Sequence, residues 1–274
     1  MTFAGEVRSQ ERFEFGRNWL RFLSSVTEQR IQNAAASLAA MLRTGNLRGL
    51  RLLDIGCGSG LSSVAAHRLG ASVHSFDSDP QSVACTLEMR RRFFSGDGDW
   101  TVEQGSALDQ AYLRSLGSFD IVYAWGVLHH TGAMWNALEN ALMPVAPGGR
   151  LFVAIYNDQG SRSRRWRAIK RLYNHTPPSL RGGLALAVAI HQWWRRMLKD
   201  FLMLRPFSTW RAYSVQRGMS PWRDVVDWVG GYPFEVAKPE EIFDFYRSRN
   251  CELLALKTCG GGLGCNEFVF RRIL

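Results

Sequence analysis

The chain has 274 residues, of which 46% are hydrophobic and 21% are charged, and this composition is typical of a globular protein with a sizeable core. It excludes a chain that is disordered throughout. The first residues contain no apolar segment of the signal-peptide kind. The longest purely aliphatic run, residues 184–190, is far shorter than the roughly 20 residues of a membrane-spanning helix. We therefore expect a cytoplasmic protein.

The net charge of +10 is concentrated in one segment. Residues 160–223 contain fourteen arginines and lysines and a single acid, Asp200, whereas the rest of the chain carries a small excess of negative charge. The five cysteines are odd in number and include no Cys-x-x-Cys pair, which predicts free thiols in a reducing compartment. A metal site built from Cys259 and Cys265 is the alternative, and we expect no metal.

Two helices are expected first, over residues 11–25 and 28–43. Short apolar runs then alternate with helical patterns. Strands are expected over 51–56, 72–79, 100–105, 119–126 and 150–157, and helices over 61–70, 80–93, 111–117 and 134–146. The alternation stops at residue 160, and the segment to about 236 is expected to be mostly helical. It resumes with a helix over 239–250 and strands over 251–260 and 266–273.

Strands that alternate with helices predict an α/β fold with a doubly wound, mostly parallel, seven-stranded Rossmann-like sheet. The last two strands are joined by a short glycine-rich turn, which predicts an antiparallel hairpin at the C-terminus. We expect an N-terminal helical extension over 1–48, a core over 49–159 and 236–274, and a basic helical insertion over 160–235 after strand five.

The first strand of the alternation ends in the sequence Asp-Ile-Gly-Cys-Gly-Ser-Gly, residues 54–60. Glycines at alternate positions allow a ligand to approach the backbone closely, just before a helix begins. A dinucleotide fingerprint has the spacing GxGxxG, which this chain lacks. Asp54 suits a ligand with a positive group, and Asp77, at the end of the second strand, suits the hydroxyl groups of a ribose.

This DxGxGxG motif followed by Asp77 resembles the class I S-adenosylmethionine (SAM)-dependent methyltransferases, over about residues 50–157 and 238–274. The resemblance implies that SAM is the cofactor, with its methionine part against the glycine loop and its ribose on Asp77. The adenine position in strand three, often an aspartate in the family, is Ser106 here, so backbone groups would replace that contact. The cofactor site implied is Asp54, Gly56, Cys57, Gly58, Gly60, Asp77, Ser78, Ser106, Ala107 and Trp125.

Candidate acceptor residues follow strands four and five. Methyl transfer requires an aligned nucleophile and removal of its proton. His129 is a candidate general base, because the ordinary histidine pKa lies near neutrality. His130 is expected either to contact the substrate or to have only a structural role in packing. Tyr156 and Asn157 are expected to line the pocket and to assist catalysis.

Two further positions carry open alternatives. Asp158 contacts the substrate or caps the next helix. In the N-terminal extension, Trp19 covers the SAM and acceptor pocket or only docks the extension on the core.

The basic insertion, residues 160–235, admits several interpretations, and its basic part, residues 160–223, holds five of the ten tryptophans. Basic and aromatic residues together are typical of RNA binding, of helices on anionic lipid, or of a lid over an acidic or bulky acceptor. Partnerless surface helices are a fourth possibility. The Asn/Asp-Pro-Pro-aromatic motif common in enzymes that methylate base amino groups is absent after strand four, where residues 124–130 read AWGVLHH. The position after strand five favours a lid, and residues 184–194 suit a lipid-like acceptor or a homodimer interface.

The sequence therefore predicts a SAM-dependent methyltransferase that acts without metal on a small or medium organic acceptor, with oxygen the favoured atom. The residues VLHHT, 127–131, look similar to the strand-four region of ubiquinone-pathway and natural-product methyltransferases. The alternatives are an RNA methyltransferase that uses the basic insertion and a non-catalytic SAM-binding protein. Peripheral contact with a membrane is left open.

Overall fold

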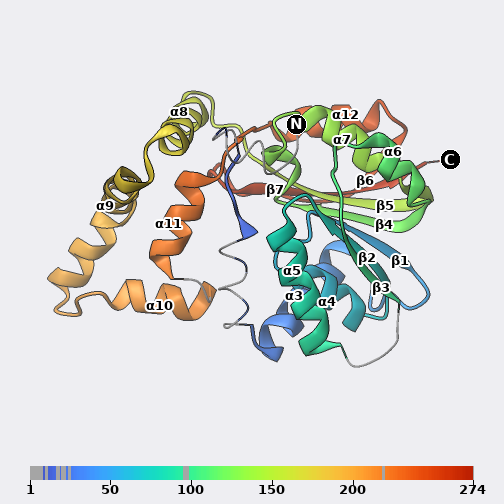
Figure 1. The fold of residues 1–274 in the computed structure, drawn as a ribbon, viewed down its shortest axis with the longest axis horizontal. Helices are drawn as coiled ribbons and strands as arrows, with labels where there is room; N and C mark the ends of the chain where they lie inside the picture. The colour runs from blue at the N-terminus through green and yellow to red at the C-terminus, as the bar shows by residue number, and fades with distance from the viewer. Residues whose placement is uncertain are drawn as a thin grey trace.

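The computed structural model describes residues 9, 12–16, 19, 23, 26–94, 99–217 (backbone only for 214–217) and 220–273. Its centre is one seven-stranded sheet in the order β3-β2-β1-β4-β5-β7-β6 (Figure 1). The first five strands of that order are parallel, and β7 is antiparallel to both β5 and β6, which confirms the expected sheet and hairpin. The strands are β1 (Arg51–Ile55), β2 (Ser72–Asp77), β3 (Trp100–Gln104), β4 (Phe119–Trp125), β5 (Val145–Tyr156), β6 (Cys251–Lys257) and β7 (Cys265–Arg272).

Helices cover both faces of the sheet (Figure 1). The helices α3 (Glu28–Leu42), α4 (Leu61–Arg68) and α5 (Pro80–Phe93) pack on one face, where Ile31, Val64 and Met89 are buried. The helices α6 (Gln110–Ser115), α7 (Met134–Leu142) and α12 (Pro239–Arg247) pack on the other. Because both faces are covered, residues 52–55 of β1 and 151–155 of β5 are buried without a break.

One expected helix differs from the structure. The helix expected over residues 134–146 ends at Leu142, and β5 already begins at Val145. Pro144 accounts for this difference, because a proline has no backbone N–H and cannot donate the next helical hydrogen bond. The helix expected over 11–25 falls largely outside the described residues, whereas the helix expected over 28–43 is present as α3.

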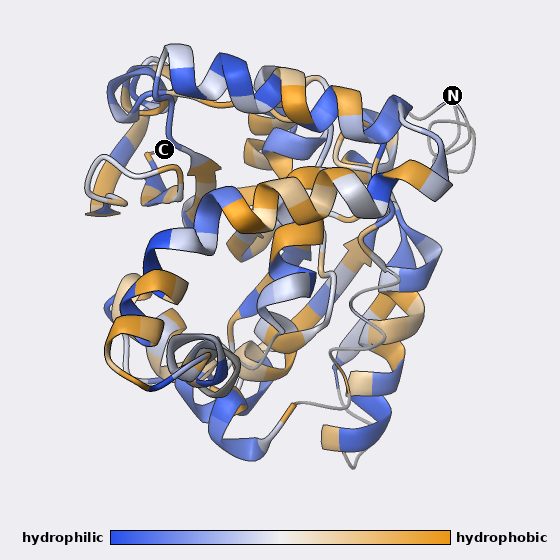
Figure 2. Ribbon diagram, turned by 90° about the vertical axis from the view of Figure 1, so that its left-hand side faces the viewer, coloured by the Kyte–Doolittle hydropathy of each residue, from blue (hydrophilic) through white to orange (hydrophobic). Residues whose placement is uncertain are grey.

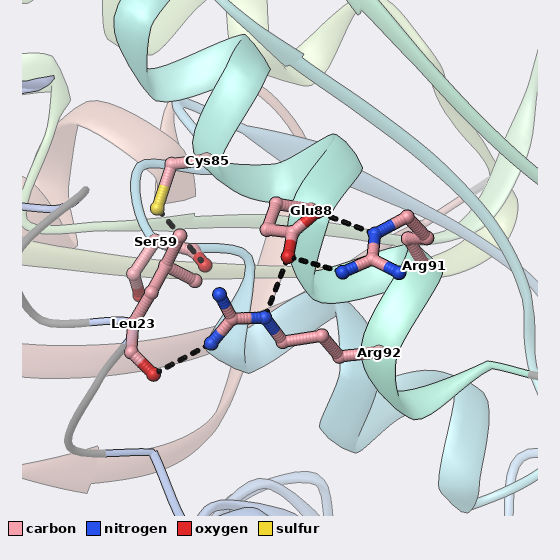
Figure 3. A network of polar contacts seen from close by, with 6 residues as sticks. All are labelled: Leu23, Ser59, Cys85, Glu88, Arg91 and Arg92. Carbon is pink, nitrogen blue, oxygen red and sulfur yellow. Dashed lines mark hydrogen bonds and ion pairs between the residues drawn. The ribbon is translucent and has the colours of Figure 1, made fainter.

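Helix α5 connects the glycine loop with the N-terminal segment (Figure 3). Its Cys85 Sγ lies 3.8 Å from the carbonyl oxygen of Ser59 in the loop. Near its C-terminal end, Glu88 accepts hydrogen bonds from Arg91 at 2.7 Å and from Arg92 at 2.6 Å. Arg92 also donates to the carbonyl of Leu23 at 3.3 Å. The N-terminal segment is thereby held beside the loop on which we expect the cofactor.

The insertion after β5 is helical, as expected, and stands to one side of the sheet (Figure 1). It consists of α8 (Ser161–His175), α9 (Pro178–Leu202), α10 (Ser208–Arg217) and α11 (Pro221–Gly230). These helices have a small core of their own, in which Trp193 of α9 packs with Val225 and Val229 of α11. Within the described ranges, no helix is both long enough and apolar enough to cross a membrane.

Candidate active site

The glycine loop lies between β1 and α4, at the carboxyl end of the sheet. Gly56, Gly58 and Gly60 all have positive φ, at 73°, 53° and 78°, a conformation that residues with a Cβ adopt at a cost. At Gly56 a side chain is also excluded by space, because a Cβ would lie 2.2 Å from a methyl group of Val127. Glycine is therefore required at Gly56, and the loop backbone is left open to a ligand.

Asp77 stands at the end of β2 and faces the same loop. Its Oδ2 accepts a hydrogen bond from the backbone N–H of Gly58 at 3.0 Å, and its Oδ1 accepts one from Asp79 at 2.9 Å. Burial raises the pKa of Asp77 to about 6, so the carboxylate is ionised near neutral pH. A carboxylate has about four acceptor positions. Two of them are used here, so Asp77 retains the capacity to accept hydrogen bonds from two further hydroxyl groups.

A cavity of about 1050 Å³ opens over these residues. Small-molecule pockets usually measure about 300–1,000 Å³, so this cavity has room for a cofactor together with an acceptor. The carboxyl ends of the strands form its floor, and the N-terminal segment, α9, α10, α11 and the β6–β7 turn form its walls. Ten of the residues predicted from the sequence line it: Trp19, Gly56, Gly58, Asp77, Ser78, Ser106, Ala107, Trp125, His130 and Tyr156.

Asp54 does not line the cavity, contrary to the role expected from the motif. It is 1% exposed and lies behind the loop, where Ser63 of α4 donates a hydrogen bond to it at 2.5 Å. Ser63 is in turn 2.8 Å from the hydroxyl of Ser75, which accepts from the indole of Trp100 at 2.9 Å. Since the Ser63 proton is directed at Asp54, Ser75 must donate to Ser63. Asp54 therefore ends a buried chain of hydrogen bonds that fixes α4 against β1 and β2.

Cys57 and Gly60 are also absent from the cavity wall. The hydroxyl of Thr86, on α5, donates to the Cys57 sulfur at 3.2 Å. A Cβ at Gly60 would lie 3.0 Å from the Thr86 Cα. These two loop residues pack the loop against α5 and leave ligand contact to Gly56 and Gly58.

His129 and His130 lie on one 3-10 turn, η2 (Leu128–His130), but only His130 faces the cavity. The ring of His129 is fully buried, and neither nitrogen makes a hydrogen bond to the described residues. Burial, assisted by the neighbouring His130 and Lys170, lowers the pKa of His129 well below its usual value. The placement of His129 behind the wall disagrees with its expected role as the general base.

His130 has a defined protonation pattern. Its Nδ1 lies 2.6 Å from the carbonyl oxygen of Pro233. A carbonyl only accepts, so Nδ1 carries the proton and Nε2 is the basic nitrogen. Burial lowers the pKa of His130 to about 3, so the ring is neutral across the physiological range. In this position a neutral imidazole faces the cavity, and its Nε2 has no hydrogen-bond donor among the residues that the structure describes.

Tyr156 at the end of β5 and the two polar residues that follow it have different surroundings. Tyr156 lines the cavity within an aromatic group, with ring centroids 5.5 Å from His130 and 5.2 Å from Phe234. Asn157 does not line it: its side chain donates to Gly262 at 3.1 Å and accepts from Asn266 at 3.0 Å, which anchors the β6–β7 turn. Asp158 accepts from the backbone of Gly160 at 2.9 Å and closes the turn before α8.

Several cavity residues were not singled out by the sequence. They come from the N-terminal segment, from the insertion and from the β6–β7 hairpin, far from the glycine loop in the chain. The aromatic and glycine-rich stretch near residue 230 was a visible signal for Trp228, but nothing in the sequence separated the inner from the outer face of α9. The main additions are Arg12, Phe13, Trp193, Arg196, Asp224, Trp228, Lys257 and Glu267.

Lys170 of α8 is a buried cation beneath the insertion wall. It is 1% exposed, and its Nζ donates to the carbonyl of Trp228. The ammonium also lies 4.1 Å from the centroid of the Trp228 ring and 4.8 Å from that of Phe234. Burial lowers the pKa of Lys170 to about 7. These contacts hold α8 against Trp228 of α11 and against Phe234, which follows α11.

Comparison with known proteins places the chain in a family. Residues 26–218 match the family described as "Methyltransferase domain". A ubiquinone biosynthesis O-methyltransferase of Sinorhizobium fredii is 35% identical over 111 residues, which cover 40% of this chain and 43% of that protein. A ribosomal protein L11 methyltransferase of Methylococcus capsulatus is 34% identical over 122 residues, which cover 41% of this chain and 36% of that protein. The chain thus spans less than half the length of these curated relatives.

The solved structures agree on the fold. Magnesium protoporphyrin IX methyltransferase from Synechocystis PCC 6803, with bound S-adenosylhomocysteine, aligns with a TM-score of 0.53 at 16% identity, over 88% of this chain and 83% of that one. At this identity the likeness shows the fold alone. The match to the methyltransferase family covers well over half of the chain. The chain therefore belongs to the methyltransferase-domain family, and the family that its DxGxGxG motif and Asp77 predicted is confirmed.

Proposed function

We propose that the protein is a SAM-dependent methyltransferase that methylates a hydroxyl group of a small or medium aromatic acceptor. The observation that carries the proposal is that Gly58, Asp77, His130 and Tyr156 all line one cavity. The first two suit a nucleoside, and the last two suit a reacting hydroxyl.

The residues present fit the cofactor. The open backbone at Gly56 and Gly58 would pass along it, and Asp77 would accept hydrogen bonds from its ribose. Ser106 and Ala107, after β3, would lie on the adenine side. When bound, SAM supplies a methyl group on a sulfonium, so the protein needs only to position the nucleophile and remove a proton.

Two observations support an oxygen acceptor. The Nε2 of His130 can accept a hydrogen bond from the acceptor hydroxyl and so direct its oxygen toward the methyl group. With a pKa of about 3, His130 would take the proton only as the new C–O bond forms, because the O–H then becomes strongly acidic. The relative from Sinorhizobium fredii, whose name specifies O-methylation, supports the same atom.

The aromatic walls support an acceptor with a ring. Trp193, Tyr213 and Trp228 of the insertion line the cavity together with the core residue Tyr156, whose ring centroid lies 5.8 Å from that of Trp228. Flat apolar side chains pack well against an aromatic ring, and Arg196 at the same wall suits a negatively charged or polar substituent. The insertion would therefore act as the lid over the acceptor.

Methyl transfer from labelled SAM to a panel of phenols, catechols, amines, thiols and RNA tests the proposal. We expect turnover with at least one hydroxyl acceptor and a loss of about a hundredfold or more in kcat for His130→Ala, with S-adenosylhomocysteine affinity within about threefold. His175→Ala, at an exposed histidine of α8, is the matched control and should retain full turnover. Methylation of RNA alone, or SAM binding with no turnover across the panel, would contradict the proposal.

A further inference from the structure

An exposed apolar surface runs along the outer side of α9 and around its end. Leu186, Ile190, Trp194 and Leu198 are exposed at four-residue spacing, so they form one stripe on the helix. The stripe continues into the turn between α9 and α10, which we call the α9–α10 tip: Phe201, Leu202, Met203, Leu204 and Phe207, all at least half exposed. Figure 2 shows this side of the molecule, where hydrophobic and hydrophilic segments alternate along the helices that face the viewer.

The backbone of the tip is held in an uncommon conformation. Leu204 and Phe207 have φ of 54° and 62°, in the left-handed region that bulky residues rarely adopt. Asp200 holds the turn together, because its carboxylate accepts hydrogen bonds from both the backbone and the hydroxyl of Thr209. Its carbonyl also accepts from the backbone of Arg205 at 2.9 Å. A strained turn is thus fixed in the shape that presents two large apolar side chains outward, with Leu204 90% exposed.

The charge around this surface is of one sign. Arg195, Lys199, Arg205 and Arg211 are exposed on α9, the tip and α10. Between residues 178 and 217 the only acid is Asp200, which is 6% exposed and whose carboxylate is hydrogen-bonded to Thr209. An apolar stripe bordered by cations is typical of helices that lie in the interface of an anionic bilayer, where apolar side chains enter the acyl region and cations meet headgroups.

We propose that α9 and the α9–α10 tip form a docking surface for an anionic lipid bilayer. The alternative occupant is a second copy of this chain. An isologous contact through this surface would bring two cationic patches together, and their repulsion disfavours it. The helix lies along the bilayer surface and does not cross it.

The docking surface also lies next to the cavity. Trp193 and Arg196 of α9 line the cavity, whereas Trp194 is exposed on the outer stripe. Docking would therefore place the cavity beside the acyl boundary, so the acceptor class that fits is an aromatic compound with an apolar tail dissolved in the membrane. This last step rests on the proposed methyltransferase function, but bilayer docking does not.

Flotation of the full chain with vesicles tests docking. We expect binding to equimolar phosphatidylglycerol and phosphatidylcholine, and at least about tenfold weaker partitioning to phosphatidylcholine alone. Raising the salt from about 0.1 M to about 1 M shortens the screening length from about 10 Å to about 3 Å and should weaken binding strongly. The double variant Leu204→Asn with Phe207→Asn should lower the partition constant by about tenfold or more. Asparagine tolerates positive φ, so this variant keeps the turn.

Two further variants complete the test. Arg205→Ala and Arg211→Ala should each weaken binding to the anionic vesicles by about fivefold, since each cation near such a surface contributes about 1 kcal/mol. Leu87→Ser, at a 45% exposed leucine of α5 on the core, is the matched control and should bind vesicles as the unmodified chain does. Affinity for S-adenosylhomocysteine, measured without lipid, should be unchanged in all variants, which separates docking from the proposed function.

Absence of binding to the anionic vesicles would overturn the proposal. So would equal partitioning of the double variant and the unmodified chain. A third contrary result is a tip variant that changes the oligomeric state in size-exclusion chromatography but leaves vesicle binding intact, because that would assign the surface to a second copy.

Discussion

Among single substitutions, Asp77→Asn changes the proposed cofactor site most specifically. The carboxylate of Asp77 already accepts from the backbone N–H groups of Gly58 and Asp79. An asparagine has only one acceptor oxygen, so its amide N–H₂ would face either a backbone donor or a ribose hydroxyl. Two hydrogen bonds from a ligand to a charged acceptor contribute about 1.5–3 kcal/mol each. Their loss predicts an affinity for S-adenosylhomocysteine lower by about 10²–10⁴-fold.

The pKa of Asp77 adds a pH signature. Burial raises this pKa to about 6, so the acceptor form is lost as the pH falls through that value. Affinity of the unmodified chain should therefore drop by about tenfold between pH 7.5 and pH 5, and Asp77→Asn should lack this drop. Isothermal titration calorimetry with S-adenosylhomocysteine at both pH values measures the effect.

The control for Asp77→Asn is Asp109→Asn. Asp109 caps α6 by accepting from the backbone of Tyr112 at 3.0 Å and does not line the cavity. It should bind S-adenosylhomocysteine as the unmodified chain does. If Asp77→Asn binds within about threefold of the unmodified chain at pH 7.5, Asp77 does not hold the ribose and the assignment is wrong.

Two stability predictions concern buried charges outside the ligand contacts. Burial raises the pKa of Asp54 to about 7 from 3.8, so the folded state holds an extra proton at acidic pH. The free energy of unfolding should therefore fall by about 3 kcal/mol from pH 5 to pH 8 because of Asp54. Asp54→Asn can still accept a hydrogen bond from Ser63, and it should abolish this part of the pH dependence measured by urea unfolding. Burial lowers the pKa of Lys170 from 10.5 to about 7, so the folded state binds fewer protons than the unfolded chain above that value. Stability should rise by about 2 kcal/mol from pH 7 to pH 9 through Lys170, and Lys170→Met should lack this rise. A variant whose pH slope equals that of the unmodified chain would contradict the corresponding assignment.

The sheet and the cofactor loop were largely predictable from the sequence because both depend on local patterns. Apolar runs, glycine spacing and helix caps are short-range signals, and they located every strand. The error at Pro144 arose because the helical pattern was extended past a residue that ends helices.

The position of Asp54 shows that a sequence motif does not by itself fix the role of each of its residues. Side chains of a strand alternate between its two faces. Ile55 lines the cavity, and Asp54, its neighbour, points to the α4 side, where Ser63 meets it. The motif indicates that an acid is required there but not on which face of the strand it acts. Likewise, the sequence did not indicate which of the neighbouring residues His129 and His130 faces the cavity.

The acceptor wall could not be predicted because it depends on tertiary packing. Trp193 and Arg196 lie about 135 residues from Gly58 along the chain and reach the cavity only because α9 folds back over the sheet edge. The basic and aromatic composition of the insertion pointed to a partner. Only the three-dimensional arrangement divides α9 into an inner side at the cavity and an outer apolar stripe.

A crystal structure with S-adenosylhomocysteine bound would test the central claim most directly. We expect the ribose hydroxyls on the carboxylate of Asp77, the backbone of Gly58 along the ligand, and the sulfur directed toward the space bounded by His130 and Tyr156. A ligand bound elsewhere, or bound here with its sulfur directed away from His130, would contradict the proposed site and the role of His130 in methyl transfer.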